Sequence, residues 1–197
     1  MDKCRLLYDL WVLFTEEHSD YEVRMTAIDG KDSSPETAEL IESVEDGASW
    51  QKDMDFLELC RIPFGCAVSE HHPLAQEAVF TPDMLEGQTV VVFERGPSQD
   101  LQTMCRQLEE KKIRVIRSGA FLPSTIWDSS YYHRILLVPL VWQDILFDVT
   151  IKPCRWDYTI PYGIFSRKDL SSSAKDFLNY IRDVYSPGST RKIIPVF

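Results

Sequence analysis

The sequence lacks features that whole classes of protein require. No apolar run reaches the roughly 18 residues of a membrane-spanning helix, and the first residues show neither the apolar core nor the cleavage site of a secretion signal. The five cysteines are odd in number and lie among apolar neighbours, which is typical of buried thiols in a reducing compartment. We therefore expect a cytoplasmic protein with no membrane partner.

Positive charge is also scarce. The 197 residues include 21 Lys and Arg against 31 Asp and Glu, which gives a formal net charge of -10. A protein that grips nucleic acid by itself needs a basic surface to displace counterions from the phosphates. The chain is therefore not expected to bind DNA on its own.

Motifs for catalysis or for a cofactor are missing as well. There is no glycine-rich phosphate loop, and no Gly-x-Ser-x-Gly elbow supplies a serine to His133 and Asp128 for a triad. His71 and His72, even with a nearby cysteine, match no compact zinc pattern, so a structural or exposed role is favoured for them. We expect no enzyme activity, no cofactor and no metal.

The sequence does contain many apolar residues, and their spacing predicts strands that alternate with helices. Hydrophobic residues make up 44% of the chain and aromatic residues 12%, enough to build real cores. Periodicity predicts helices over 3–18, 34–47, 98–110, 124–133 and 172–185, and strands over 21–28, 54–59, 62–69, 88–93, 113–116 and 135–141. This order predicts right-handed crossovers and an open, mainly parallel α/β sheet.

Three of the predicted helices begin with serine or threonine after a strand. In an open α/β sheet such turns gather along one edge, where helix N-termini carry partial positive charge. The hypothesis is a small anionic ligand bound by Ser33, Ser34, Ser98, Gln99, Ser124 and Thr125, with Trp127 as a wall of the site. For any single serine, the alternative is ordinary helix capping.

Four arginines lie near predicted strand ends or in segments between predicted elements. They are Arg61, Arg95, Arg117 and Arg155. Any of them could pair bidentately with a ligand carboxylate, and surface salt bridges are the alternative in so acidic a chain.

A series of short segments, taken in order, resembles a known family. The series includes Leu6-Leu7 through Phe14, Asp53 to Phe56, the His72-Pro73-Leu74-Ala75 turn, Gly96-Pro97-Ser98 and the Lys168 to Tyr185 segment. Together they resemble the effector-binding domain of LysR-type transcriptional regulators over nearly the whole chain. The winged helix-turn-helix module and linker helix that normally precede this domain have no counterpart, so we expect no DNA-binding domain in this chain.

The resemblance implies a fold of two Rossmann-like lobes, periplasmic-binding-protein-like, with a ligand cleft between them. Two segments would join the lobes, near 61–65 and 154–158, so that lobe one is 1–61 plus 155–197 and lobe two is 62–154. It also implies a small-molecule effector and a homodimer, with the first helix around Leu10 and Trp11 opposite the 98–110 helix. DNA would be reached only through the absent module. The alternative is a solute-binding protein of a transporter, which the missing secretion signal opposes.

Overall fold

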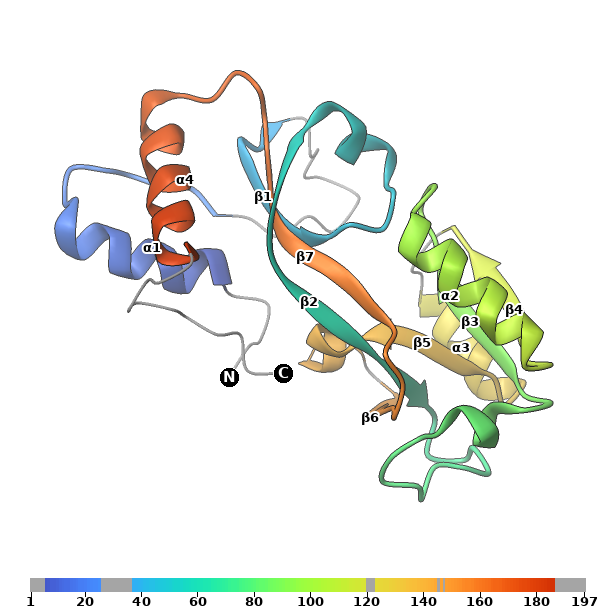
Figure 1. Cartoon of the computed structure of the whole chain (residues 1–197). Helices are drawn as coiled ribbons and strands as arrows, with labels where there is room; N and C mark the ends of the chain where they lie inside the picture. The colour runs from blue at the N-terminus through green and yellow to red at the C-terminus, as the bar shows by residue number, and fades with distance from the viewer. Residues whose placement is uncertain (1–5, 26–36, 120–122, 145, 147, 187–197) are drawn as a thin grey trace. The chain divides into compact units, whose positions relative to one another are not determined.

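The computed structural model describes residues 6–25, 37–119, 123–144, 146 and 148–186. The helices are α1 (Leu6–Glu17), α2 (Gln99–Glu110), α3 (Pro123–Tyr131) and α4 (Ser172–Val184), with short 3-10 helices η2 (Ser49–Asp53), η3 (Pro82–Leu85) and η4 (Leu140–Asp144). The strands are β1 (Leu40–Val44), β2 (Asp55–Val68), β3 (Thr89–Phe93), β4 (Arg114–Ser118), β5 (Ile135–Pro139), β6 (Thr150–Pro153) and β7 (Thr159–Ser166), all shown in Figure 1. None of the helices in these ranges has the length and apolar character that crossing a membrane requires.

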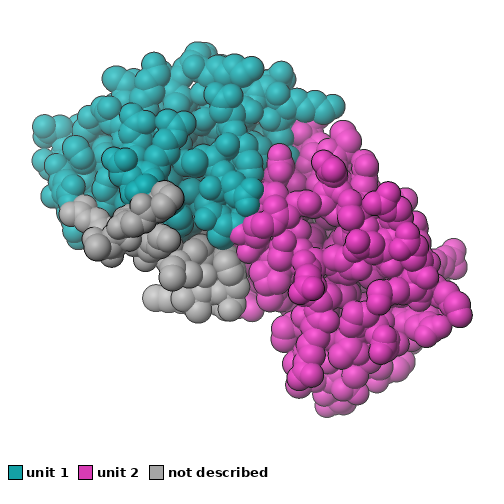
Figure 2. Space-filling view, in the orientation of Figure 1, with its two compact units in different colours: residues 1–43, 50–60, 162–197 teal, residues 44–49, 61–161 magenta. Residues whose placement is uncertain are grey.

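The chain divides into two compact units, coloured separately in Figure 2. Unit 1 comprises residues 1–43, 50–60 and 162–197, and unit 2 comprises residues 44–49 and 61–161. The chain passes from one unit to the other inside β2, after Cys60, and again inside β7, after Pro161. The short segment 44–49 interrupts unit 1 and belongs to unit 2.

Unit 2 is built on three parallel strands. β3 pairs with β4 from Thr89 and Arg114 onward, and with β5 from Val90 and Ile135 onward. β4 and β5 lie on opposite sides of β3, so right-handed crossovers place α2 and α3 on opposite faces of the sheet, as Figure 1 shows. With both faces covered, β3 and β5 are almost continuously apolar, which is why their sequence pattern predicted them correctly, whereas β4 at the edge of the sheet carries Arg114 and Arg117.

The core on one face of this sheet is formed by buried side chains from several elements. Its members are Ala67, Val91, Phe93, Ile126, Leu136 and Val138. Side chains alternate along a strand, so Val90 and Val92 point to the other face, where α2 packs on β4. There α2 buries one stripe of apolar side chains, Leu101, Met104, Cys105 and Leu108.

The complete sheet is mixed, whereas strand and helix alternation predicted a mainly parallel one. Its order is β1-β7-β2-β5-β3-β4, with β6 paired to β2. β2 runs antiparallel to β5 (Gly65 opposite Val138) and to β6 (Gly65 opposite Pro153). A parallel pair needs a long crossover, usually a helix. β2 is instead followed by the 69–88 segment, which contains only the short helix η3.

In unit 1, α1 packs on α4 through aromatic side chains. The ring centroid of Phe177 lies 5.2 Å from that of Phe14 and 5.1 Å from that of Trp11. Leu10 is 0% exposed inside this packing. The solvent-exposed face of α1 therefore carries Tyr8 and Val12 and not Leu10, and the expected dimer contact around Leu10 and Trp11 stays a prediction.

The N-terminus of α1 is held by a side chain from β1. Glu42 accepts hydrogen bonds from the backbone N–H groups of Leu6 at 3.2 Å and Leu7 at 2.8 Å, and the Tyr162 hydroxyl of β7 donates to the same carboxylate. The first N–H groups of a helix have no partner within the helix, and a carboxylate also complements its dipole. Glu42 therefore links the sheet of unit 1 to its helical layer.

The helix predicted over 34–47 is wrong, because Leu40–Val44 forms strand β1. The spacing of its apolar residues fits a helix, but pairing in the sheet outweighed that local preference. Ser33 and Ser34 lie outside the described residues, and so does the end of the strand predicted over 21–28, whose described part, 21–25, is not a strand. No pattern predicted β6 or β7, since Pro161 and Gly163 interrupt the apolar run of β7.

Candidate functional site

The three parallel strands of unit 2 end at a common edge of the sheet. α2 follows β3, α3 follows β4 and η4 follows β5 directly, so the N-termini of these helices lie at the carboxyl ends of the strands. Ligands of open α/β sheets bind in the crevice at this edge. This edge is therefore the candidate functional site, and Ser98, Gln99, Ser124 and Thr125 all lie in the turns or first turns of its helices.

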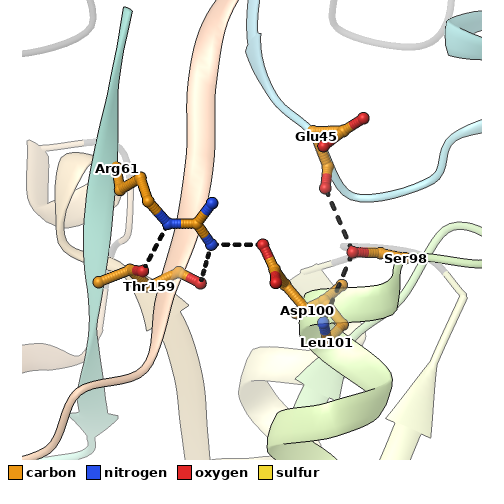
Figure 3. A network of polar contacts seen from close by, with 6 residues as sticks. All are labelled: Glu45, Arg61, Ser98, Asp100, Leu101 and Thr159. Atoms are coloured by element: carbon orange, nitrogen blue, oxygen red, sulfur yellow. Dashed lines mark hydrogen bonds and ion pairs between the residues drawn. The ribbon is translucent and has the colours of Figure 1, made fainter. Parts of the chain in front are cut away.

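Ser98 caps α2. Its backbone is extended (φ -114°, ψ 123°), and its hydroxyl accepts a hydrogen bond from the Leu101 N–H at 3.5 Å. The same hydroxyl donates to the carbonyl oxygen of Glu45 at 3.4 Å (Figure 3). Both contacts are long, and the residue is 8% exposed. Ser98 is therefore an ordinary helix N-cap. Gln99, the first residue of α2, is exposed.

Arg61 lies close to the start of α2 and holds two elements together. Its Nε donates to the Thr159 hydroxyl at 2.9 Å and its Nη2 to the Thr159 carbonyl oxygen at 3.4 Å (Figure 3). The same Nη2 forms an ion pair with Asp100 in the first turn of α2. Both partners of this ion pair are 42% exposed, so it contributes at most about 1 kcal/mol to stability. The free energy lost when Arg61 exchanges Asp100 for another anion is therefore small.

Arg95 has a different, structural partner. Its Nε donates to the buried carboxylate of Asp46 at 2.5 Å, and Asp46 also accepts from the Ala48 N–H at 3.3 Å. A buried carboxylate that loses its cation is destabilising by about 3–5 kcal/mol. Arg95 therefore anchors segment 44–49 to the turn before α2 and is poorly suited to receive a ligand.

Two glycines allow this segment to approach the turn. A Cβ built on Gly96 would lie 1.7 Å from the carbonyl oxygen of Gly47, and Gly47 itself has a positive φ of 78°. The two backbones are thus in direct contact, with no side chain between them. This contact fixes the position of the loop that leads into Ser98.

The residues predicted on α3 are placed in several environments. Ser124 is exposed, Thr125 is half-buried, and Ile126 is buried in the core of the sheet face that α3 covers. Trp127 is 58% exposed, and one turn later Tyr131 is 78% exposed. Trp127 therefore presents an aromatic surface to solvent near the start of α3.

The remaining arginines have other surroundings. Arg117 forms ion pairs with Glu94 at 3.5 Å and with Glu109 at 3.4 Å. A hydrogen bond with the Cys105 thiol raises the pKa of Arg117, and the two carboxylates raise it by less. The Arg155 side chain is exposed, and its backbone N–H donates to the Phe80 carbonyl oxygen at 2.9 Å.

Of the two adjacent histidines, His72 is structural and His71 is exposed. His72 is buried, its Nδ1 accepts from the Leu74 N–H at 3.1 Å, and its Nε2 lies 3.2 Å from the His133 carbonyl oxygen, to which it donates. Burial lowers the pKa of His72. His71 is exposed, 3.4 Å from Glu70. Within the described ranges, no group of three or more His, Cys, Asp or Glu side chains is placed to hold a metal ion.

Sequence reasoning identified Arg61 and Ser98 but missed their partners. Thr159 lies on β7, which the pattern did not predict, and Glu45 contributes a backbone oxygen that no side-chain signal can reveal. Asp100 was visible as an acidic residue two positions after the cap, a common place for a carboxylate in a first turn.

No protein-family model matches the sequence, and no curated protein matches it. Solved structures do match. The regulatory domain of CcmR from Synechocystis PCC6803, in complex with 2-PG, superposes with a TM-score of 0.59 at 14% identity over 96% of both chains. The effector-binding domain of QuiR in complex with shikimate gives 0.58 at 17% identity, over 89% of this chain and 88% of that one. CbnR, a LysR family transcriptional regulator, gives 0.66 at 15% identity, over 92% of this chain and 65% of CbnR.

The chain has the fold of LysR-type effector-binding domains. The two-lobed, periplasmic-binding-protein-like α/β fold implied by the resemblance in the sequence is thereby confirmed. These neighbours are regulatory domains and not enzymes. At 14–17% identity the likeness concerns the fold.

Proposed function

We propose that this chain is the effector-sensing domain of a LysR-type transcriptional regulator and that it binds a small anion. The observation that carries the proposal is the carboxyl edge of unit 2, where Arg61, Ser98 and the first turn of α2 come together. Support comes from neighbours of the same fold that are solved with 2-PG and with shikimate, the latter a carboxylate.

Arg61 is the centre of the proposed binding step. An anion that approaches the N-terminus of α2 competes with Asp100 for the Arg61 guanidinium, and the solvent-accessible ion pair is weak enough to exchange. The incoming group gains the partial positive charge of the helix N-terminus and the Ser98 hydroxyl. Gln99, Ser124, Thr125 and Trp127 complete the proposed site, together with Ser33 and Ser34, which lie outside the described residues.

Effector binding in this domain is proposed to act on DNA-binding modules through the two lobes. The two lobes of this proposal are residues 1–61 plus 155–197 and residues 62–154. Effector binding shifts the relative populations of lobe arrangements in a homodimer, whose contacts pass the change to DNA-binding modules outside this sequence. The domain works in the cytoplasm and catalyses no reaction.

Ligand titrations with matched variants test this function. The wild-type chain is screened by thermal denaturation against small carboxylates and phosphorylated acids, and a true effector at about 100 times its Kd adds about 2.7 kcal/mol of stability. At roughly 2–4 °C per kcal/mol for a chain of this size, Tm rises by about 5–11 °C.

The Ser98→Ala variant should bind that effector at least tenfold more weakly. The Ser171→Ala variant is the matched control, since Ser171 caps α4 in unit 1 through a comparable hydrogen bond to Ala174. Asp100→Asn should tighten binding, because the competing carboxylate is gone, and Arg61→Gln should weaken it. Equal affinities for Ser98→Ala and Ser171→Ala, or changes of the same sign at Asp100 and Arg61, would contradict the proposed site.

A further inference from the structure

Two of the cysteines in unit 2 are in direct contact. Cys66 lies on β2 and Cys154 directly follows β6, and their Sγ atoms are 3.2 Å apart. Cys66 is opposite Lys152 in the antiparallel register, and Cys154 is two positions further along, so the two side chains share one face of the strand pair. Disulfide bonding requires about 2.05 Å between the sulfurs. The two sulfurs must therefore approach by about 1 Å for the bond to form.

The backbone on both sides of the pair is fixed by hydrogen bonds. The Phe80 N–H donates to the Pro153 carbonyl oxygen and the Arg155 N–H to the Phe80 carbonyl oxygen, both at 2.9 Å, so Cys154 is held between them. The Trp156 indole N–H donates to the Phe64 carbonyl oxygen at 2.9 Å, which ties the same segment to β2. These hydrogen bonds hold the backbone of Cys154 beside β2.

The two thiols differ in their access to solvent. Cys66 is 0% exposed, whereas Cys154 is partly exposed. Burial raises the pKa of the Cys66 thiol, and its contact with Cys154 raises it further. A small oxidant in solution therefore reaches Cys154 first, and Cys66 is shielded from direct attack.

We propose that Cys66 and Cys154 form a redox-active pair that a peroxide converts to an intrachain disulfide. The Cys154 thiolate attacks one peroxide oxygen, the O–O bond breaks, and a sulfenic acid forms at Cys154, while the second oxygen leaves as hydroxide and becomes water with the proton that the Cys154 thiol released. The Cys66 sulfur then attacks the Cys154 sulfur, the S–O bond breaks, and the leaving hydroxide departs as water with the Cys66 proton. Two thiols lose two electrons in total, hydrogen peroxide accepts them, and two water molecules form.

The buried Cys66 thiol suits the second step. Once the Cys154 thiolate has become a neutral sulfenic acid, no negative charge at Cys154 opposes loss of the Cys66 proton. The departing hydroxide is a base next to that proton. A dithiol reductant reverses the reaction by thiol–disulfide exchange. The disulfide covalently links β2 to the segment after β6, whether or not the proposed effector is bound.

Peptide mapping of the full chain tests the proposal. Trypsin cleavage after Arg61, Arg95, Arg134 and Arg155 places Cys66 in peptide 62–95 and Cys154 in peptide 135–155, each with no other cysteine. The reduced protein is treated with hydrogen peroxide, free thiols are alkylated, and the peptides are identified by mass spectrometry. The expected product is a cross-linked 62–95/135–155 pair, which returns to two alkylated peptides after treatment with dithiothreitol.

Variants assign the order of events. Cys154→Ser should slow oxidation of Cys66 at least 100-fold, and Cys66→Ser should leave a sulfenic acid at Cys154 that dimedone traps. Cys60→Ser, the matched control in unit 1, should react like the wild type. The proposal is overturned if the wild-type cross-link involves any other cysteine or joins two chains, if Cys66 and Cys154 stay alkylatable while Cys60 or Cys105 oxidises, or if Cys154→Ser slows Cys66 oxidation less than threefold. The wild-type mapping decides the matter even where a variant fails to fold.

Discussion

Replacing Gly96 with alanine should destabilise unit 2 severely. The added Cβ would lie 1.7 Å from the carbonyl oxygen of Gly47, where an ordinary contact is 3.4–4 Å. Both groups are backbone, so no side-chain rotation relieves the overlap and the two chain segments must separate. That separation pulls segment 44–49 away from the turn and strains the bond between Arg95 and the buried Asp46.

The expected cost follows from that bond. Leaving a buried carboxylate without its cation costs about 3–5 kcal/mol, so we expect a loss of at least about 3 kcal/mol in the free energy of unfolding. At roughly 2–4 °C per kcal/mol, Tm should fall by about 6–12 °C. The measurement is urea unfolding followed by tryptophan fluorescence, with thermal unfolding as the second probe.

Two other glycines serve as controls. Gly87 has a positive φ of 76° but no heavy atom within 4 Å of a built Cβ, so Gly87→Ala should cost only the left-handed strain of about 1–2 kcal/mol. Gly119 has neither feature, and Gly119→Ala should be neutral or stabilise by about 0.4–1 kcal/mol. If Gly96→Ala costs no more than Gly87→Ala, the contact between the two loops does not exist in solution.

Three further predictions concern single side chains. Because the pKa of His72 is lowered in the folded state, the unfolded chain takes up the proton first, and stability should fall as pH drops below about 6.5. Denaturant titrations between pH 7.5 and 5.5 should show a smaller pH dependence for His72→Gln, and an unchanged slope would refute the assignment. Trp156→Phe removes the donor to the Phe64 carbonyl oxygen and should cost about 1–3 kcal/mol in urea unfolding, with no loss contradicting that bond. Leu10→Ala should cost about 2–5 kcal/mol because the side chain is 0% exposed, whereas Val12→Ala, on the exposed face of the same helix, should change stability by no more than about 0.5 kcal/mol, and equal costs would argue against the packing of α1.

Elements whose signals are local were predictable from the sequence. β3 reads as a strand because its apolar run is buried on both faces, and α2 reads as a helix because Ser98 caps it and one apolar stripe recurs at helical spacing. β1 was mistaken for part of a helix, since its strand state depends on pairing with β7, far along the chain. No local pattern encodes that pairing.

The candidate site shows the same division. Ser98 and Arg61 were found because a capping serine and an arginine at a strand crossing are local signals. Their partners depend on contacts between distant segments, such as Thr159 with Arg61 and Asp46 with Arg95. The interrupted run of β7 concealed the first of these, and the second follows from a close backbone approach that spacing does not predict.

The interleaving of the two units determines the order in which they can form during synthesis. The long segment of unit 2, residues 61–161, is continuous and follows segment 44–49, so all of this unit has been made before the last part of unit 1 emerges. α1 is made first, but its buried Phe14 waits for Phe177 on α4, close to the end of the chain. A nascent chain therefore carries α1 with its apolar face uncovered until α4 has been made, and such a surface is one that chaperones bind and that aggregates when they do not.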